Sequence, residues 1–269
     1  MYNKLCSLKN YSFDKNGQML LADSYTKYRF GGFRDVNHYA QPDELVPWLR
    51  EIIKQARETY PQALTLFPDN QFWNEVLNIE TITRYSSYSE PKIDTLSYEK
   101  KGIFRYGPSA VETCAAIYNR GLLQSDDILL DIGSGEGAFL AYSAVLPLRE
   151  VIGVEIRSAL YEKSLLNFKN HCLLYPQIKT TLRCDNILNC QDLIERATVF
   201  YLCNPVGQKL LKEILKTIEQ SLKANPREIK FIYASSKFNL TVSRQQWLSS
   251  AVAIKADNEN PLYFWENIK

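Results

Sequence analysis

The amino-acid sequence predicts an α/β fold in which a doubly wound, mainly parallel sheet follows a mainly helical N-terminal extension. From about residue 107 onward, short apolar runs of strand type alternate with helical patterns, which is typical of parallel strands joined by crossover helices. The first run ends in a glycine-rich turn, and the last two look like an antiparallel hairpin. Residues 1–106 are richer in Tyr, Arg and Asn and lack this alternation. We therefore expect a lid or substrate-recognition region over residues 1–106 and a ligand-binding domain over residues 107–269.

Length and composition indicate a folded protein. The chain has 269 residues, of which 45% are hydrophobic and 12% aromatic, so disorder is not expected. Its formal net charge of +2 predicts no broad phosphate-binding surface, although a local basic patch stays possible. Six scattered cysteines, two histidines and no apolar signal segment or membrane-length run predict an intracellular, cytoplasmic protein without a bound metal or membrane contact.

Each element follows from a local pattern. Ser109 and Glu112 have capping-box spacing, which predicts a helix that begins after Ser109 and ends near Gly121. Elsewhere, apolar runs between turn residues predict strands, and apolar residues at helical spacing predict helices. The expected strands are 127–132, 151–155, 180–185, 198–203, 229–234, 251–255 and 262–265, with helices at 138–146, 158–174 and 210–222.

The turn after the first strand, Asp-Ile-Gly-Ser-Gly-Glu-Gly at 131–137, is the strongest chemical signal. In a doubly wound sheet, ligands bind beyond the carboxyl ends of the strands, and glycines let a ligand approach the backbone. The spacing differs from the G-x-G-x-x-G of dinucleotide sites, and the carboxylates of Asp131 and Glu136 would repel a pyrophosphate. They suit the ammonium and sulfonium groups of S-adenosylmethionine (SAM), which we predict as the cofactor. The expected cofactor-binding residues of the turn are Asp131, Gly133, Ser134, Gly135 and Gly137.

Two acids later in the chain complete the predicted cofactor site. Glu155 ends the second strand, at the interval where an acid accepts hydrogen bonds from ribose hydroxyls in nucleotide-binding folds. Asp185 follows the third strand and is a candidate acceptor for the adenine amino group. Asp192 lies nearby and is the alternative for that role.

The turn, Gly153-Val154-Glu155, Asp185 and the terminal hairpin resemble the class I, seven-strand SAM-dependent methyltransferases. The resemblance covers about residues 107–269. It implies a Rossmann-like sheet with strand order 3-2-1-4-5-7-6 and an antiparallel seventh strand. It also implies that the turn backbone contacts the methionine portion of SAM, Glu155 the ribose and Asp185 the adenine.

A second resemblance concerns the methyl acceptor. Tyr106-Gly107, the glycine turn, the Asn204 loop and Ser235-Ser236-Lys237 are similar in order and spacing to elements of the non-SET histone-lysine methyltransferases. This likeness implies N-methylation of an amine such as a protein lysine. The chain departs from the family pattern at Pro108, which replaces a Glu, and at Pro205-Val206, which replaces Asn-Phe. We predict Asn204, Pro205 and Tyr106 as catalytic residues, since the first two face the methyl-donor end and Tyr106 immediately precedes the SAM-binding domain.

Other interpretations remain open at the level of sequence. The acceptor is a small metabolite or a nucleic acid in one alternative, and the chain is an inactive SAM-binding regulatory module in another. An NAD-binding protein is disfavoured by the turn spacing and by Asp131. The aromatic and Arg residues of the N-terminal region suit either an aromatic cage or simple packing on the sheet. They include Tyr25, Tyr28, Arg29, Phe30, Phe33, Arg34, Trp73, Arg84, Tyr85, Tyr88 and Phe104.

Overall fold

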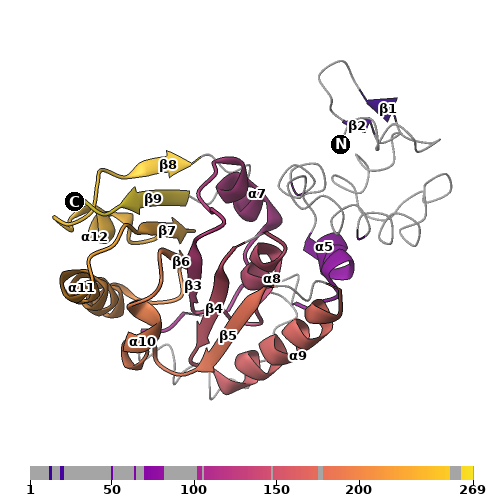
Figure 1. Ribbon diagram of the computed structural model, residues 1–269, viewed down its shortest axis with the longest axis horizontal. Coiled ribbons are helices and arrows are strands. Elements are labelled where there is room, and N and C mark those ends of the chain that lie inside the picture. Colours follow the sequence, from indigo (N-terminus) through magenta and orange to yellow (C-terminus); the bar gives the residue numbers. More distant parts are fainter. Residues whose placement is uncertain are drawn as a thin grey trace.

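The computed structural model describes residues 12–13, 19–20, 50, 64, 70–81, 102–104, 106–146, 148–174, 178–254 and 262–268 (Figure 1). A two-stranded pair, β1 (Ser12–Phe13) and β2 (Met19–Leu20), and helix α5 (Asn70–Leu77) precede residue 102. A helix is also expected over residues 41–60, where only the helical Arg50 is described. The aromatic and Arg residues named between 25 and 34 and between 84 and 88 lie outside the described residues.

A seven-stranded sheet forms the centre of the molecule. Its strands are β3 (Ile128–Ile132), β4 (Glu150–Glu155), β5 (Lys179–Cys184), β6 (Val199–Cys203), β7 (Lys230–Ala234), β8 (Val252–Ile254) and β9 (Leu262–Glu266). They lie in the order β5-β4-β3-β6-β7-β9-β8, and β9 runs antiparallel to both of its neighbours. If the seven strands of this sheet are numbered in chain order, their order in the sheet is 3-2-1-4-5-7-6, and the seventh strand is antiparallel to its neighbours. The predicted Rossmann-like topology is confirmed.

Helices cover both faces of the sheet (Figure 1). On one face lie α7 (Val111–Asn119), α8 (Ala138–Ala144) and α9 (Ser158–Leu174). On the other lie α10 (Gln191–Ile194), α11 (Gln208–Ala224) and α12 (Asn239–Ser243), and a 3-10 turn, η3 (Ile187–Asn189), precedes α10. Alternate residues of β3 enter two separate hydrophobic cores, Leu129 in one and Leu130 in the other. This is why the strand is apolar on both faces, as expected for a parallel sheet between helical layers.

Helix α5 shares the core of the α7–α8 face. Its Trp73 is fully buried in the same cluster as residues of α7 and α8. Its first residue, Asn70, accepts a hydrogen bond of 2.9 Å at Oδ1 from the backbone N–H of Val111, the first residue of α7. The boundary expected at residue 106 stays a prediction.

The predicted capping box at the start of α7 is wrong. The residue at the cap position is Ala110, which has no side chain able to cap, and Asn70 satisfies the first helical N–H instead. The Ser109 hydroxyl is hydrogen-bonded to the hydroxyl of Tyr201 at 2.8 Å, and both side chains are buried. A buried tyrosine hydroxyl requires a partner, and this requirement takes Ser109 away from the helix end.

Within the described part of the chain, none of the helices combines the length and apolar character needed to cross a membrane.

Candidate active site

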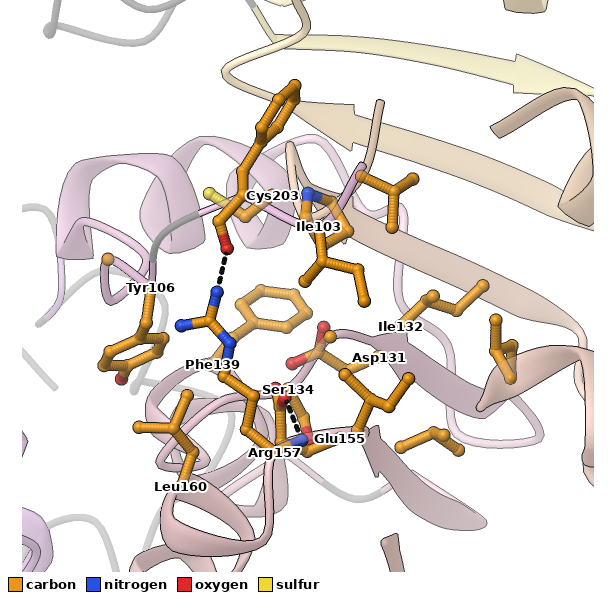
Figure 2. Close-up of a pocket in the computed structure, with 18 of the residues that line it drawn as sticks. Ile103, Tyr106, Asp131, Ile132, Ser134, Phe139, Glu155, Arg157, Leu160 and Cys203 are labelled. Carbon is orange, nitrogen blue, oxygen red and sulfur yellow. Dashed lines mark hydrogen bonds between the residues drawn. The ribbon is translucent and has the colours of Figure 1, made fainter. Parts of the chain in front are cut away.

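A cleft opens at the carboxyl ends of β3, β4 and β6, where a doubly wound sheet binds its ligands. It holds about 800 Å³ of empty space, part of it open to solvent. Figure 2 shows Asp131, Glu155 and Ser134 deep in this cleft, with Tyr106, Arg157 and Phe139 around them. Most of the predicted site residues line it, namely Tyr106, Asp131, Gly133, Ser134, Glu155, Asp185 and Pro205.

The glycine turn has a backbone that other residues would not adopt easily. Gly133 and Gly135 have φ values of +79° and +56°, in the left-handed region that favours glycine. A Cβ atom on Gly135 would lie 2.0 Å from Cε2 of Tyr106, and one on Gly133 would lie 2.5 Å from Cβ of Pro205. The two glycines therefore allow Tyr106 and Pro205 to pack directly against the turn. The predicted cofactor loop and two of the predicted catalytic residues are in contact.

Glu155 is fixed by backbone amides on both sides. Its Oε2 accepts a hydrogen bond of 2.8 Å from the N–H of Gly135, and its Oε1 accepts one of 2.9 Å from the N–H of Arg157. Burial raises the pKa of this carboxyl group, and the two amide hydrogen bonds oppose the rise. Each carboxylate oxygen can accept a second hydrogen bond. A ribose diol in the cleft would thus meet an acceptor whose position the turn itself sets.

Asp131 is a buried acid that faces the cleft with only 3% of its surface exposed. No hydrogen-bond donor or cation from the described residues contacts its carboxylate. Burial, and to a lesser degree the negative charge of Glu155, raises the pKa of Asp131 well above its ordinary value. A buried carboxylate is stabilised by a positive partner. The ammonium and sulfonium of SAM have the charge that this end of the cleft lacks, so the residues present fit the cofactor.

Glu136 does not share this role. It is fully buried and does not line the cleft, and its Oε1 forms an ion pair of 2.8 Å with Lys163 of α9. The side chain of Asn167, also on α9, donates to the backbone carbonyl of Glu136 at 2.9 Å. The expectation that two acids of the turn face the cofactor is therefore wrong for Glu136. The acids that line the cleft beside Asp131 are Glu155 and Asp185, from the next two strands.

The structure distinguishes Asp185 from Asp192. Asp185 lines the cleft, and its Oδ1 accepts hydrogen bonds from the N–H of Asn186 and from Nδ2 of Asn189. Asp192 lies away from the cleft lining and forms a bidentate pair with Arg183 at 2.6 and 2.7 Å. Of the two candidates, Asp185 is therefore the acid that lines the β5 end of the cleft, and its contact with adenine stays a prediction.

The loop after β6 carries Asn204 and Pro205. Pro205 lines the cleft, whereas the side chain of Asn204 accepts a hydrogen bond of 3.0 Å at Oδ1 from the hydroxyl of Tyr233 and is absent from the lining. Asn204 has a φ of +48°, so the chain turns sharply at this residue. The loop is also paired with residues 102–104, because the N–H of Phe104 donates to the carbonyl of Pro205 at 2.9 Å.

Tyr106 covers the glycine turn. Its ring lies against Gly135, and burial raises the pKa of its phenol well above the ordinary value, so the hydroxyl keeps its proton at neutral pH. Tyr106 is therefore a neutral group beside the cofactor turn. Gly137 supports the turn from outside the cleft, since it is the left-handed residue from which α8 begins.

Sequence reasoning missed Arg157 and Phe139. Arg157 is buried and lines the cleft, and its guanidinium donates to the carbonyl of Phe104 (Figure 2). Phe139, the second residue of α8, stacks on Tyr201 with ring centroids 3.6 Å apart. An Arg two residues after the predicted ribose acid was an available signal for the first. Nothing local marked the second, because Tyr201 is distant in the chain. Among the described residues, no group of three or more His, Cys, Asp or Glu is placed to hold a metal.

The topology and the cleft define a class I SAM-dependent methyltransferase. The family model described as "Histone methylation protein DOT1" matches residues 85–253, which is more than half of the chain. The chain therefore belongs to the DOT1 histone methylation family, and SAM is its cofactor. Among the curated proteins, no match to this chain was found.

Solved structures with a similar chain path include three proteins of low sequence identity. One is a precorrin 8W decarboxylase from Methanobacterium thermoautotrophicum, with 17% identity, a TM-score of 0.45, and coverage of 61% of this chain and 93% of that one. The second is an RNA methyltransferase from Salinibacter ruber in complex with S-adenosylhomocysteine, with 15% identity, a TM-score of 0.44, and coverage of 60% and 92%. The third is an O-methyltransferase from Bacillus cereus with the same ligand, with 13% identity, a TM-score of 0.46, and coverage of 74% and 96%.

Proposed function

We propose that this methyltransferase N-methylates an amine, and that the amine is the side chain of a protein lysine. Membership of the DOT1 family supports this choice of acceptor. The observation that carries the proposal is the loop 203–206, whose Pro205 packs against Gly133 of the cofactor turn. The acceptor would therefore approach the methyl donor past this loop.

The lining of the cleft at this loop suits an amine nucleophile. Ile103, Pro205, Val206 and Leu210 are apolar, and Cys203 has a thiol whose pKa is raised by burial, so it stays neutral. An apolar surrounding disfavours an ammonium ion and favours the neutral amine, which holds the lone pair needed for attack. Bound SAM supplies an activated methyl group. What the chain contributes is the alignment of the acceptor and the exclusion of water.

We assign Asn204 a positioning role in this proposal. Its side-chain carbonyl accepts from Tyr233, so the residue orients the loop through its left-handed backbone. Pro205 and Tyr106 are the proposed contacts with the bound ligands, because both line the cleft and both touch the glycine turn.

The test is incubation of the protein with SAM labelled in the methyl group and a fractionated cell extract. We expect label in the protein fraction, recovered as methyl-lysine after acid hydrolysis. A parallel extract whose lysine amines have been blocked by acetylation should accept no label, because an amide nitrogen has no lone pair available for attack. Label confined to nucleic acid or to small molecules would overturn the lysine assignment. Binding of SAM without any transfer would indicate a regulatory module instead.

A further inference from the structure

Two aromatic rings lie together at the edge of the cleft. Phe104 lines the cleft, and its ring stacks on that of Phe238 with centroids 6.2 Å apart and planes inclined by 24°. The Nζ atom of Lys237 lies 5.3 Å from the centroid of Phe104 and 5.8 Å from that of Phe238. Both distances are within the range in which an aromatic face attracts a cation. The structure thus shows an ammonium group held by a pair of rings.

Both rings are fixed to the elements that frame the acceptor loop. The backbone of Phe104 donates to the carbonyl of Pro205 and accepts from the guanidinium of Arg157. Phe238 follows β7 (Lys230–Ala234), the strand whose Tyr233 hydroxyl donates to Asn204. The ring of Phe104 is therefore tied to the acceptor loop by backbone contacts, and Phe238 comes from the chain that leaves the neighbouring strand.

The ammonium group of Lys237 contacts aromatic rings, whereas four other described lysines pair with acids. Lys163, Lys179, Lys223 and Lys230 each form an ion pair with a carboxylate. Lys237 is exposed and forms no ion pair with the described residues, so the two rings are the partners recorded for its ammonium. The ring pair therefore attracts an ammonium without help from a carboxylate.

We propose that the Phe104–Phe238 pair is the docking site for the cationic side chain of the methyl acceptor, and that Lys237 occupies this site when no acceptor is bound. The proposal rests on the proposed function, since it takes the acceptor to be an amine. An arriving ammonium would displace Lys237 from the rings and lose its proton to solvent at this exposed edge. The neutral amine would then enter the apolar part of the cleft. Lys237 then acts as an internal competitor, which lowers the apparent affinity for the acceptor.

Choline and its uncharged isostere 3,3-dimethyl-1-butanol provide a direct test, because they differ in charge at nearly constant shape. Binding is followed by NMR titration of the full chain saturated with S-adenosylhomocysteine, which fills the cofactor site beside Asp131 and carries no methyl group to transfer. We expect choline to bind and the alcohol not to bind. Lys237→Gln should strengthen choline binding about two- to fivefold, and Phe238→Leu should weaken it by a similar factor. Lys169→Gln, which changes an exposed lysine on α9, is the matched control and should have no effect.

Two results would overturn the inference: equal binding of the alcohol and choline, or unchanged choline binding in Phe238→Leu when that variant retains wild-type SAM affinity. With a methyl-accepting protein fraction, Lys237→Gln should lower KM and leave kcat unchanged. The titration requires no turnover, so it separates the two claims. If choline binds as expected and no methyl-lysine forms, the proposed function fails and the cation site stands. If methyl-lysine forms but choline binding is unchanged in Phe238→Leu, the proposed function stands and the cation site fails.

Discussion

The hydroxyl of Tyr233 donates a hydrogen bond of 3.0 Å to Oδ1 of Asn204, and this contact joins the ends of two neighbouring strands. Cys203 and Ala234 are paired in the sheet, so Asn204 and Ser235 are the residues that follow at the same level. Both have left-handed backbones, with φ values of +48° and +50°. The loops after β6 and β7 therefore turn together, and a side chain of β7 helps to set the shape of the loop beside the cofactor.

Tyr233→Phe removes this hydroxyl and keeps the ring. We expect kcat to fall about two- to tenfold, the loss that corresponds to one neutral hydrogen bond, with SAM affinity unchanged because Glu155 and Asp131 are untouched. Steady-state kinetics and calorimetric titration with SAM measure the two quantities. The same change in an Asn204→Ala background should have little added effect on kcat, since the two side chains act through one contact. Full additivity would show that Tyr233 acts elsewhere.

Glu155→Ala should weaken SAM binding by about 1–3 kcal/mol, because it removes an ionised acceptor and releases the amides of Gly135 and Arg157. Calorimetric titration gives the affinity. Asp192→Asn is the control, since Asp192 lies outside the cleft and pairs with Arg183. Wild-type affinity in Glu155→Ala would show that this carboxylate does not contact the cofactor.

Gly135→Ala should be markedly more destabilising than Gly121→Ala. Both glycines have left-handed backbones, which cost an alanine about 1–2 kcal/mol. A Cβ on Gly121 has its nearest neighbour at 3.6 Å, whereas a Cβ on Gly135 would overlap the ring of Tyr106 at 2.0 Å. Overpacking of this kind adds about 1–3 kcal/mol. Thermal unfolding of both variants measures the difference, and equal melting temperatures would contradict the packing of Tyr106 on the turn.

The stability of the cofactor-free protein should fall as the pH rises through the titration range of Asp131. Its pKa in the folded state is raised above the ordinary value of 3.8, so the folded state retains the proton that the unfolded state has lost. The stabilisation that comes from this bound proton is complete at pH values below the ordinary pKa of 3.8. It is lost as the pH rises past the pKa of Asp131 in the folded state. Asp131→Asn should remove this slope and raise the melting temperature at pH 7, while SAM affinity falls about tenfold or more.

Melting curves between pH 4 and pH 8 without SAM test this prediction. Asp192→Asn is the control, because Arg183 lowers the pKa of Asp192. Removal of the Asp192 carboxylate should therefore not stabilise the protein at neutral pH. A melting temperature of Asp131→Asn at or below that of the wild type at pH 7 would show that the buried carboxylate is compensated by some other group.

Asn70→Ala should destabilise the protein by about 1 kcal/mol, the usual loss when a helix cap is removed. Asn70 accepts from the first N–H of α7 across a separation of 41 residues, so the loss would reflect the docking of α5 on α7. Chemical denaturation gives the free energy of unfolding. Ser109→Ala should remove the hydrogen bond to Tyr201 and leave the start of α7 unchanged, because Ser109 does not cap this helix.

The sequence by itself determined the features that depend on local pattern. The alternation of apolar runs and helical spacing fixed the positions of the strands. Three glycines at 133, 135 and 137 and the acid at the end of the next strand indicate a nucleotide-like ligand, because close backbone approach and a paired acceptor are needed wherever such a ligand binds. The spacing of the glycines and the acid at Asp131 then favour SAM over a dinucleotide. These features lie in short stretches of sequence, so they can be recognised without knowledge of the rest of the fold.

Only the tertiary structure decided where several side chains point. Glu136 turns away from the ligand because Lys163, 27 residues later, offers its buried carboxylate an ion pair. Ser109 does not cap α7 because its hydroxyl is hydrogen-bonded to Tyr201, 92 residues later, whose buried hydroxyl needs a partner. Asn204 faces Tyr233 for the same reason, and Phe104 meets Phe238 only after two distant loops are brought together. A buried polar group takes whichever partner the packing provides, and that partner is not encoded near it in the chain.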